Sequence, residues 1–349
     1  MKAFLLLFTL SCFGVSVNAQ IRKGQQPYQT KSLANESVKE VEVETSGGSI
    51  DVTGGTGEAR IEVYVNRNNN RNGDNELSKE EIQKRLEEDY NLDVSVRNGK
   101  LIAKARQKRN NMDWKRALSV SFRIFVPQAV STDLSTSGGS IRLANLSGEQ
   151  RFSTSGGDLD LDNLTGKTRG STSGGSISLK NTKNNDLRLN TSGGNIEATD
   201  CSGNLNLSTS GGSLRLTRLD GDINASTSGG SVRGSTIAGN LKAHTSGGDV
   251  DLRELSCSLE ASTSGGHIDV AIRKPGKFIK VSNSGGNINM QLPKGIAADL
   301  DIRADRVNTG TMANFSGTID EDTIRGKLNG GGIDVSADAG SGRISLTFQ

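Results

Sequence analysis

The sequence predicts an all-β protein: a two-sheet β-solenoid built from coils of about 18 residues, with a small helix-plus-hairpin insertion near its N-terminal end. Three observations lead to this fold class. From Thr136 onward, Thr-Ser-Gly-Gly recurs at steps of 18 or 19 residues, and aliphatic residues alternate with polar ones inside the copies. The chain also contains 44 glycines and only 4% aromatic residues, which fits many thin layers better than one thick core.

The tetrapeptide sets the period of the chain. Its nine copies begin at Thr45, Thr136, Thr154, Thr172, Thr191, Thr209, Thr227, Thr245 and Thr263. A degenerate copy begins at Asn283, and residues 329–335 resemble a further, more distant one. A fixed short period over so many copies is typical of a solenoid, in which each repeat is one supersecondary unit.

Each copy contains two predicted strands. Aliphatic residues such as Ile141 and Leu143 lie five and seven positions after the threonine, with a polar residue such as Arg142 between them. This alternation has the period of two of a half-buried strand. It returns nine residues later, for example at Leu205 and Leu207, so we expect two strands in every coil.

The glycine pair is predicted to form a corner between strands, because glycine reaches positive φ without a Cβ clash. A second corner is predicted at 145–148 and its equivalents. Strand parity turns each repeat threonine inward, where we expect hydrogen bonds along the column, and turns its flanking serines outward. The predicted corner glycines are Gly138, Gly139, Gly156, Gly157, Gly174, Gly175, Gly193, Gly194, Gly211, Gly212, Gly229, Gly230, Gly247, Gly248, Gly265 and Gly266.

Two other repeat folds fit less well. A hexapeptide helix needs an aliphatic residue every six positions, but Ser147 and Ser153 follow Ile141 at that spacing. A calcium β-roll needs Gly-Gly-x-Gly-x-Asp turns, which the chain lacks. The acidic row Asp158, Asp160 and Asp162 is interpreted as a solvated strand face, with a calcium site as the alternative.

The cysteines are predicted to be unpaired. Cys201 lies in a column otherwise filled by leucine and isoleucine, and Cys257 lies in a corner-glycine column three coils away. At the spacing of stacked strands this separation is roughly 14 Å. A disulfide requires Cα atoms within about 7 Å.

The domain boundaries follow from where the repeat begins and ends. We expect a lead segment at 20–39 and the solenoid domain at 40–349. Within it, 66–127 is the insertion, 132–292 the regular coils and 293–349 irregular C-terminal coils. Ser78 and Glu81 predict a capping box, with Leu77 and Ile82 as a hydrophobic staple. Asn98-Gly99 predicts the hairpin turn.

The first 19 residues have the pattern of a secretory signal, with Lys2, an apolar run and a small-residue exit at Ala19. We therefore expect an extracytoplasmic protein, in the periplasm or on the outer surface, that begins at Gln20. A lipoprotein attached through Cys12 is the alternative. No apolar run long enough to cross a membrane follows the signal.

The order of these segments resembles a known bacterial family. A strand coil, a short helix, a hairpin, a strand ending in Val126-Pro127 and serial Thr-Ser-Gly-Gly coils are similar to the adhesin-type, or toast-rack, β-strand-repeat domains, a family of unknown function. The resemblance covers roughly residues 40–349 and implies an extracytoplasmic β-repeat fold. The family defines no catalytic residues, so the resemblance implies none here.

The sequence predicts a protein that is not an enzyme. We predict no catalytic, cofactor-binding or metal-binding residues and no cofactor. The two histidines, His244 and His267, lie in different coils, and minimal coils leave little room for a cleft. Balanced charge, with 42 basic and 39 acidic residues, gives no field that favours nucleic acid. A basic stretch at 100–116 is interpreted as a hydrated hairpin, with contact to an anionic polymer or lipopolysaccharide as the alternative.

The leading functional hypothesis is an adhesion or binding module whose partner is a glycan or an envelope protein. The alternatives are a structural or stress-sensing component of the cell envelope and, least favoured, a polysaccharide-acting enzyme. Outward serines on neighbouring coils form a lattice that a repetitive ligand can match, although serine is also simply a small soluble residue at a strand end. The candidate ligand face consists of Ser171, Ser173, Ser208, Ser210, Ser226, Ser228, Ser262 and Ser264.

Overall fold

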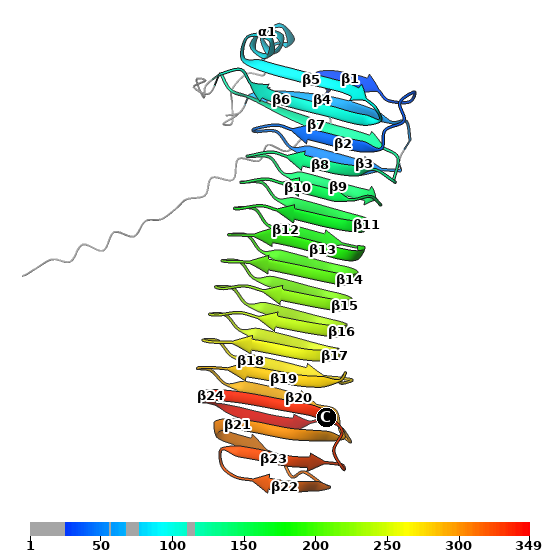
Figure 1. Cartoon of the computed structure of the whole chain (residues 1–349). Coiled ribbons are helices and arrows are strands. Elements are labelled where there is room, and N and C mark those ends of the chain that lie inside the picture. Colours follow the sequence, from blue (N-terminus) through cyan, green and yellow to red (C-terminus); the bar gives the residue numbers. More distant parts are fainter. Residues whose placement is uncertain (1–24, 56, 68–76, 110–115) are drawn as a thin grey trace, which may run out of the picture.

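The computed structural model describes residues 25–55, 57–67, 77–109 and 116–349. It is a long stack of β-strands, and the one helix of the described residues lies at the N-terminal end of the stack (Figure 1). The predicted signal segment and Cys12 fall outside the described residues. Within the described ranges, no helix is both long and apolar enough to cross a membrane.

The regular repeats form the body of the stack. Ile196 pairs with Leu214, Leu214 with Val232 and Val232 with Val250, so each repeat lies parallel to the next at the repeat spacing. The predicted two strands of a repeat often run on as one long strand bent at the second corner. The strands of the body are β8 (Ser131–Ser135), β9 (Ile141–Leu146), β10 (Gln150–Ser153), β11 (Leu159–Ser171), β12 (Ile177–Lys180), β13 (Lys183–Thr191), β14 (Ile196–Thr209), β15 (Leu214–Ser226), β16 (Val232–His244) and β17 (Val250–Thr263).

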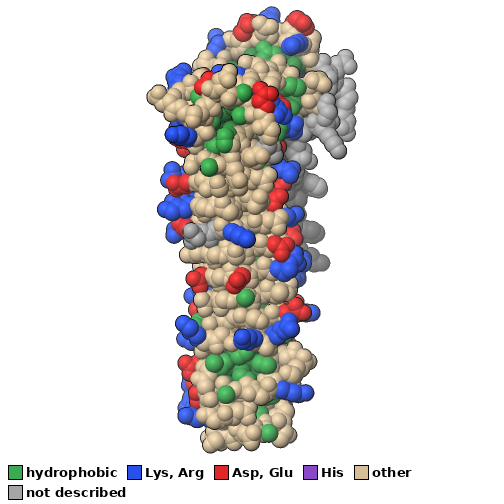
Figure 2. All heavy atoms as spheres, turned by 90° about the vertical axis from the view of Figure 1, so that its right-hand side faces the viewer, with side chains coloured by type: hydrophobic (Ala, Val, Ile, Leu, Met, Phe, Trp, Pro, Cys, Tyr) green, Lys and Arg blue, Asp and Glu red, His purple; other side chains and the backbone are tan. Residues whose placement is uncertain are grey.

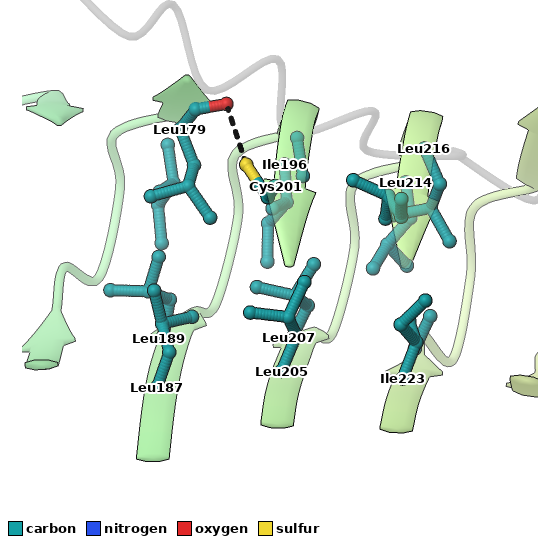
Figure 3. Close-up of a cluster of buried hydrophobic side chains, with 14 of the residues drawn as sticks. Leu179, Leu187, Leu189, Ile196, Cys201, Leu205, Leu207, Leu214, Leu216 and Ile223 are labelled. Atoms are coloured by element: carbon teal, nitrogen blue, oxygen red, sulfur yellow. Dashed lines mark hydrogen bonds between the residues drawn. The ribbon is translucent and has the colours of Figure 1, made fainter. Parts of the chain in front are cut away.

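The core runs along the inside of the stack. Ile196 and Leu214 from one half of each repeat face Leu205 and Ile223 from the other half (Figure 3). All four are at most 3% exposed. The predicted alternation of inward aliphatic and outward polar residues is confirmed, and these apolar columns supply most of the free energy that holds the repeats together.

The N-terminal repeat lies next to the body although a long insertion follows it. Glu44 pairs with Ser135 and Ile50 with Ile141, so the Thr45 repeat stacks directly on the Thr136 repeat. The insertion continues the stack on the other side, because β6 pairs with β2 and β7 with β3. The elements are β1 (Gln29–Ser32), β2 (Glu40–Glu44), β3 (Ile50–Gly54), β4 (Arg60–Arg67), α1 (Lys79–Asp89), β5 (Tyr90–Arg97), β6 (Lys100–Gln107) and β7 (Leu118–Val126).

Helix α1 begins where the sequence predicts. The Ser78 hydroxyl accepts a hydrogen bond from the Glu81 amide at 3.2 Å, which is half of the expected capping box. The Glu81 carboxylate pairs with Arg85 instead of returning to Ser78. Leu86 is buried, and the helix packs against β5, an edge strand that pairs with β6.

The C-terminal segment reverses the chain order, and here one sequence interpretation is wrong. Residues 329–335 were expected to resemble a repeat corner, but Asn329 and Gly330 turn the chain between two strands with positive φ. The corner that stacks on Gly286 lies at Gly342 instead. The strands are β18 (Ile268–Ile272), β19 (Phe278–Asn283), β20 (Ile288–Leu292), β21 (Ala298–Thr309), β22 (Phe315–Ile319), β23 (Thr323–Leu328) and β24 (Ile333–Phe348).

The last strand of the chain is therefore not the last layer. β24 pairs with β19 and β20, and β21 lies outside it, followed by β23 and then β22. The chain thus leaves one layer open between β20 and β21, and β24 occupies that layer when the chain returns.

Candidate ligand surface

Each repeat threonine ties two neighbouring repeats together. The Thr227 side chain is 3% exposed, and its hydroxyl donates a hydrogen bond to the Gly212 carbonyl of the preceding repeat at 2.7 Å. The same hydroxyl accepts from the Gly230 amide at 3.3 Å. Threonine was expected to bond along its own column, but it bonds to the backbone. Asn283 makes the same two kinds of contact, to Gly266 and Gly286, in the degenerate copy.

The two glycines of each pair have different roles, and the predicted reason for them is wrong. None of the sixteen corner glycines has a positive φ. A Cβ on the second glycine, Gly230, would lie 2.0 Å from the Gly212 carbonyl oxygen, so close stacking of backbones excludes a side chain. A Cβ on the first glycine, Gly229, would meet its nearest atoms at an ordinary 3.6 Å.

The left-handed conformation occurs at the second corner. One residue per repeat adopts it, nine positions after the threonine, with φ between 51° and 57°. The first members are asparagine or aspartate, which tolerate this region, and the later ones are not. The column consists of Asn145, Asn163, Asn181, Asp200, Arg218, Thr236 and Glu254.

The residue after each glycine pair forms a ladder that the sequence analysis missed. The Asp158 carboxylate accepts from the Ser176 amide at 2.8 Å, and the Asn195 side chain accepts from the Ser213 amide at 2.8 Å. His267 continues the ladder by accepting from the Asn287 amide at Nδ1. The restriction of this position to serine, aspartate, asparagine or histidine is the signal that would have revealed it, because each of them offers an acceptor.

The eight candidate serines point outward as strand parity predicts. Ser171, Ser173, Ser210, Ser228 and Ser264 are exposed. The other three are half-buried, and they are Ser208, Ser226 and Ser262. The eight serines form two separate columns, because the serine before each threonine lies on the sheet and the serine after it lies at the corner.

The sheet column is not made of serine throughout. Ser171 pairs with Asn190, Asn190 with Ser208 and Ser226 with His244. The Ser208 hydroxyl donates to the Asn190 side-chain oxygen at 2.5 Å, and Ser262 lies 2.8 Å from His244 Nδ1. The column therefore offers hydroxyls, an amide and an imidazole at the spacing of stacked strands, about 4.8 Å.

A second outward column on the same sheet changes from arginine to asparagine along the stack. Arg151, Arg169 and Arg188 are in register, and Asn206 and Asn224 follow them. The arginines line a shallow hollow of about 380 Å³ together with Ser153, Ser171 and Asn190. Their guanidinium groups are already paired, because Arg151 lies 2.8 Å from Glu149, and Arg169 and Arg188 lie 3.0 and 3.1 Å from Asp186.

The remaining candidate groups are structural or solvated in this fold. The Asp162 carboxylate accepts from the Asn181 amide group at 2.9 Å, and Asp160 lies 3.9 Å from Arg142. In the part of the chain that the structure describes, no group of three His, Cys, Asp or Glu side chains is arranged to hold a metal ion. Charges of both signs are interspersed on the face drawn in Figure 2.

The basic hairpin is largely paired with acidic neighbours. Lys100 contacts Glu40 at 2.8 Å and Glu42 at 2.6 Å, and Lys104 also contacts Glu42. Trp114 and Lys115 lie outside the described residues. These ion pairs agree with the expected hydrated hairpin.

Cys201 and Cys257 are free and buried, as predicted. Cys201 pairs in register with Leu219, and Cys257 with Gly239 of the corner column. Burial raises the pKa of the Cys257 thiol to about 11, so this thiol stays protonated and inert at neutral pH.

Comparison with known proteins agrees with the expected family. Residues 176–347 match the family model described as Toastrack DUF4097. No curated protein matches the sequence. A crystal structure described as a "putative cell adhesion protein" from Clostridium sporogenes aligns with 92% of this chain and 98% of its own, at 11% identity and a TM-score of 0.20. An alignment with so low a TM-score does not by itself establish a shared fold. The stretch that is similar to the Toastrack DUF4097 family, residues 176–347, includes the Thr-Ser-Gly-Gly strands from β12 to β17 and the C-terminal layers.

Proposed function

We propose that the protein is a non-enzymatic, exported binding module of the adhesion type, built as a two-sheet β-solenoid, and that it binds a glycan chain along its outward serine and asparagine columns. The supporting observation is the register itself. Ser208 and Ser226 are paired across β14 and β15, and so are Asn206 and Asn224. Hydroxyl and amide groups are thus held at a fixed spacing by the backbone beneath them.

A surface of this kind suits a repetitive ligand. Its donors and acceptors are placed before binding, so little ordering cost is added when a long ligand lies along the stack. Hydroxyl and amide groups are the partners that sugar hydroxyls require. The shallow hollow beside Arg169 gives an acidic sugar a place at one end, if the sugar competes with Asp186 for the guanidinium group.

The test replaces Ser208, Ser210, Ser226 and Ser228 together with lysine. Binding of the parent and the variant to a glycan array and to whole cells is then compared, after circular dichroism has confirmed the fold. A matched control places four lysines on the opposite half of the repeats, at Ser178, Thr199, Thr217 and Ser235, which are half-buried. We expect loss of binding in the first variant and retention in the control.

Equal binding by both variants and the parent would exclude the serine face. Recovery of an envelope protein in a pull-down, without any glycan signal, would favour the structural or stress-sensing alternative.

A further inference from the structure

The two ends of the stack are finished differently. At the N-terminal end, α1 packs against β5. At the other end, β22 pairs with β23 on one side, and Figure 1 shows no strand of this chain beyond it. A strand with one free edge presents unpaired backbone donors and acceptors and is able to pair with another chain.

The hydrogen bonds of β22 show which backbone groups are free. The Asn329 amide donates to the Asn314 carbonyl at 2.9 Å, and the Asp320 amide donates to the Thr323 carbonyl at 2.8 Å. Antiparallel bonding alternates along a strand, so the even-numbered residues between these two pairs also bond to β23. The amide and carbonyl groups of Phe315, Gly317 and Ile319 therefore point away from the protein.

The row of apolar side chains extends through β23 to the edge strand β22. Ile324 and Leu328 of β23 are 0% and 4% exposed, and they pair directly with Ile319 and Phe315 of β22. Phe315 is half-buried, whereas Ile319 is 51% exposed and is the exposed large hydrophobic residue of the described chain. The apolar row therefore ends at Ile319, a side chain that is half exposed to solvent.

The strand is complementary to itself. Its sequence, Phe-Ser-Gly-Thr-Ile, places an apolar residue at each end, a hydroxyl residue next to each, and Gly317 at the centre. Two copies that pair antiparallel about Gly317 set Phe315 opposite the second copy's Ile319, and their free amides and carbonyls meet. The acidic turn at 320–322 then lies beside Asn314 of the second copy, so like charges do not face each other.

We propose that two copies of this protein associate end to end through β22, with a two-fold axis at Gly317, to form one continuous sheet of double length. The interface is isologous, as in most closed homodimers. A pair of five-residue strands is smaller than the interface of a stable dimer, so we expect reversible association that depends on protein concentration. This proposal does not rest on the glycan hypothesis.

The first experiment measures sedimentation velocity of the full chain without its signal over a wide concentration range. We expect the weight-average mass to rise toward that of a dimer. Ile319→Lys places a charge against the apolar Phe315 of the second copy and should abolish the rise. The melting temperature should not change, because Ile319 is already half in solvent. Ser235→Lys, in the body of the stack, is the matched control and should associate like the parent.

The second experiment tests the register. In the proposed pairing, Ser316 lies directly opposite Thr318 of the second copy, at a site where the Cα atoms of an antiparallel pair come close enough for a disulfide. Mixing Ser316→Cys protein with Thr318→Cys protein under mild oxidation should give a cross-linked dimer, and either variant alone should give much less. A parent that stays monomeric at every concentration, or an Ile319→Lys variant that associates equally, would overturn the proposal. Equal cross-linking of the single variants would overturn the register.

Discussion

At the scale of single residues, the repeat motif divides its work among three positions. The Thr227 hydroxyl donates a hydrogen bond to the Gly212 carbonyl of the preceding repeat and accepts one from the Gly230 amide of its own repeat. Gly230 leaves room for the backbone of the preceding repeat. The residue that follows, Ser231, accepts from the next repeat's Asp249 amide at 3.3 Å. The five residues from Thr227 to Ser231 look like low-complexity sequence, but three of these positions have a specific structural role.

Removing the threonine hydroxyl should destabilise the fold. Thr227→Val keeps the shape of the side chain but leaves the Gly212 carbonyl and the Gly230 amide without this partner, so we expect a loss of about 1–3 kcal/mol in the free energy of unfolding. Thr227→Ser keeps the hydroxyl and should cost less. Urea denaturation of both variants provides the measurement, and a Val variant as stable as the parent would contradict the assigned role.

Alanine substitutions at the two glycines of one pair should have different effects on stability. Gly230→Ala forces a Cβ against the Gly212 carbonyl oxygen and should cost about 1–3 kcal/mol. Gly229→Ala meets only ordinary contacts and should remain within about 0.5 kcal/mol of the parent. Thermal melts of the two variants should separate clearly. Equal melting temperatures would mean that the repeats do not stack as closely as described.

The left-handed column contains a position where a change should help. Thr236 is β-branched and has a φ of 56°, a conformation that costs such residues free energy. Thr236→Asn should raise the free energy of unfolding by about 1 kcal/mol, because asparagine tolerates this region. Thr217→Asn, one position earlier in its repeat, has no such strain to relieve and should not stabilise. A neutral Thr236→Asn would show that the corner relaxes around the threonine.

At the scale of elements, β2 and β6 are joined by charges as well as by backbone pairing. Lys100 and Lys104 both contact Glu42, and these contacts hold the pKa of the Glu42 carboxyl below its usual range. A carboxyl whose folded-state pKa is depressed contributes stability above its unfolded-state pKa of about 4.3, and this contribution is lost as the pH falls through the folded-state value.

Replacing this carboxylate should therefore have an effect that depends on pH. Glu42→Gln should lower the free energy of unfolding by up to about 1 kcal/mol at neutral pH, since the group is partly exposed. The difference from the parent should shrink as the pH is lowered through the acidic range. Denaturant titrations at several pH values test this, with the exposed Glu36→Gln as control. A difference that does not vary with pH would contradict the ion-pair explanation.

At the scale of the whole molecule, the stack is a rod whose body is regular and whose two ends are built from sequence outside the repeat. Parallel pairing at a constant spacing keeps every outward column straight along the body. The N-terminal end uses an insertion to continue the sheets, and the C-terminal end uses a reversed order of strands.

Export of this rod is a prediction about the chain as a whole. Residues 1–19 should be removed in cells that recognise the signal, so intact mass should give a mature protein that begins at Gln20, with or without cyclisation of that residue. Lipid on Cys12 would contradict cleavage at Ala19 and support the lipoprotein alternative.

The sequence predicted the body of the fold because its information is periodic. Alternating aliphatic residues and the fixed step to the next threonine were enough to place Leu205, Leu219 and Cys201 in the core. The sequence could not show why the glycine pair is needed. A position where two backbones approach closely and a position with positive φ both favour glycine, so the two causes look alike in the sequence. The position of β24 was equally hidden, since nothing local shows that a later strand pairs with an earlier layer.

The placement of the Thr45 repeat against the Thr136 repeat also leads us to expect a particular order of folding. Contacts within the body join residues one repeat apart, so loops are short and closure is fast. The pairs β2–β8 and β19–β24 join strands that lie much farther apart along the chain. In a chain that emerges N-terminus first, β2 and β3 can pair with β6 and β7 of the insertion, but their other edges stay unpaired until the second repeat has followed. We therefore expect the middle of the rod to form early, and the two ends to close last and open first.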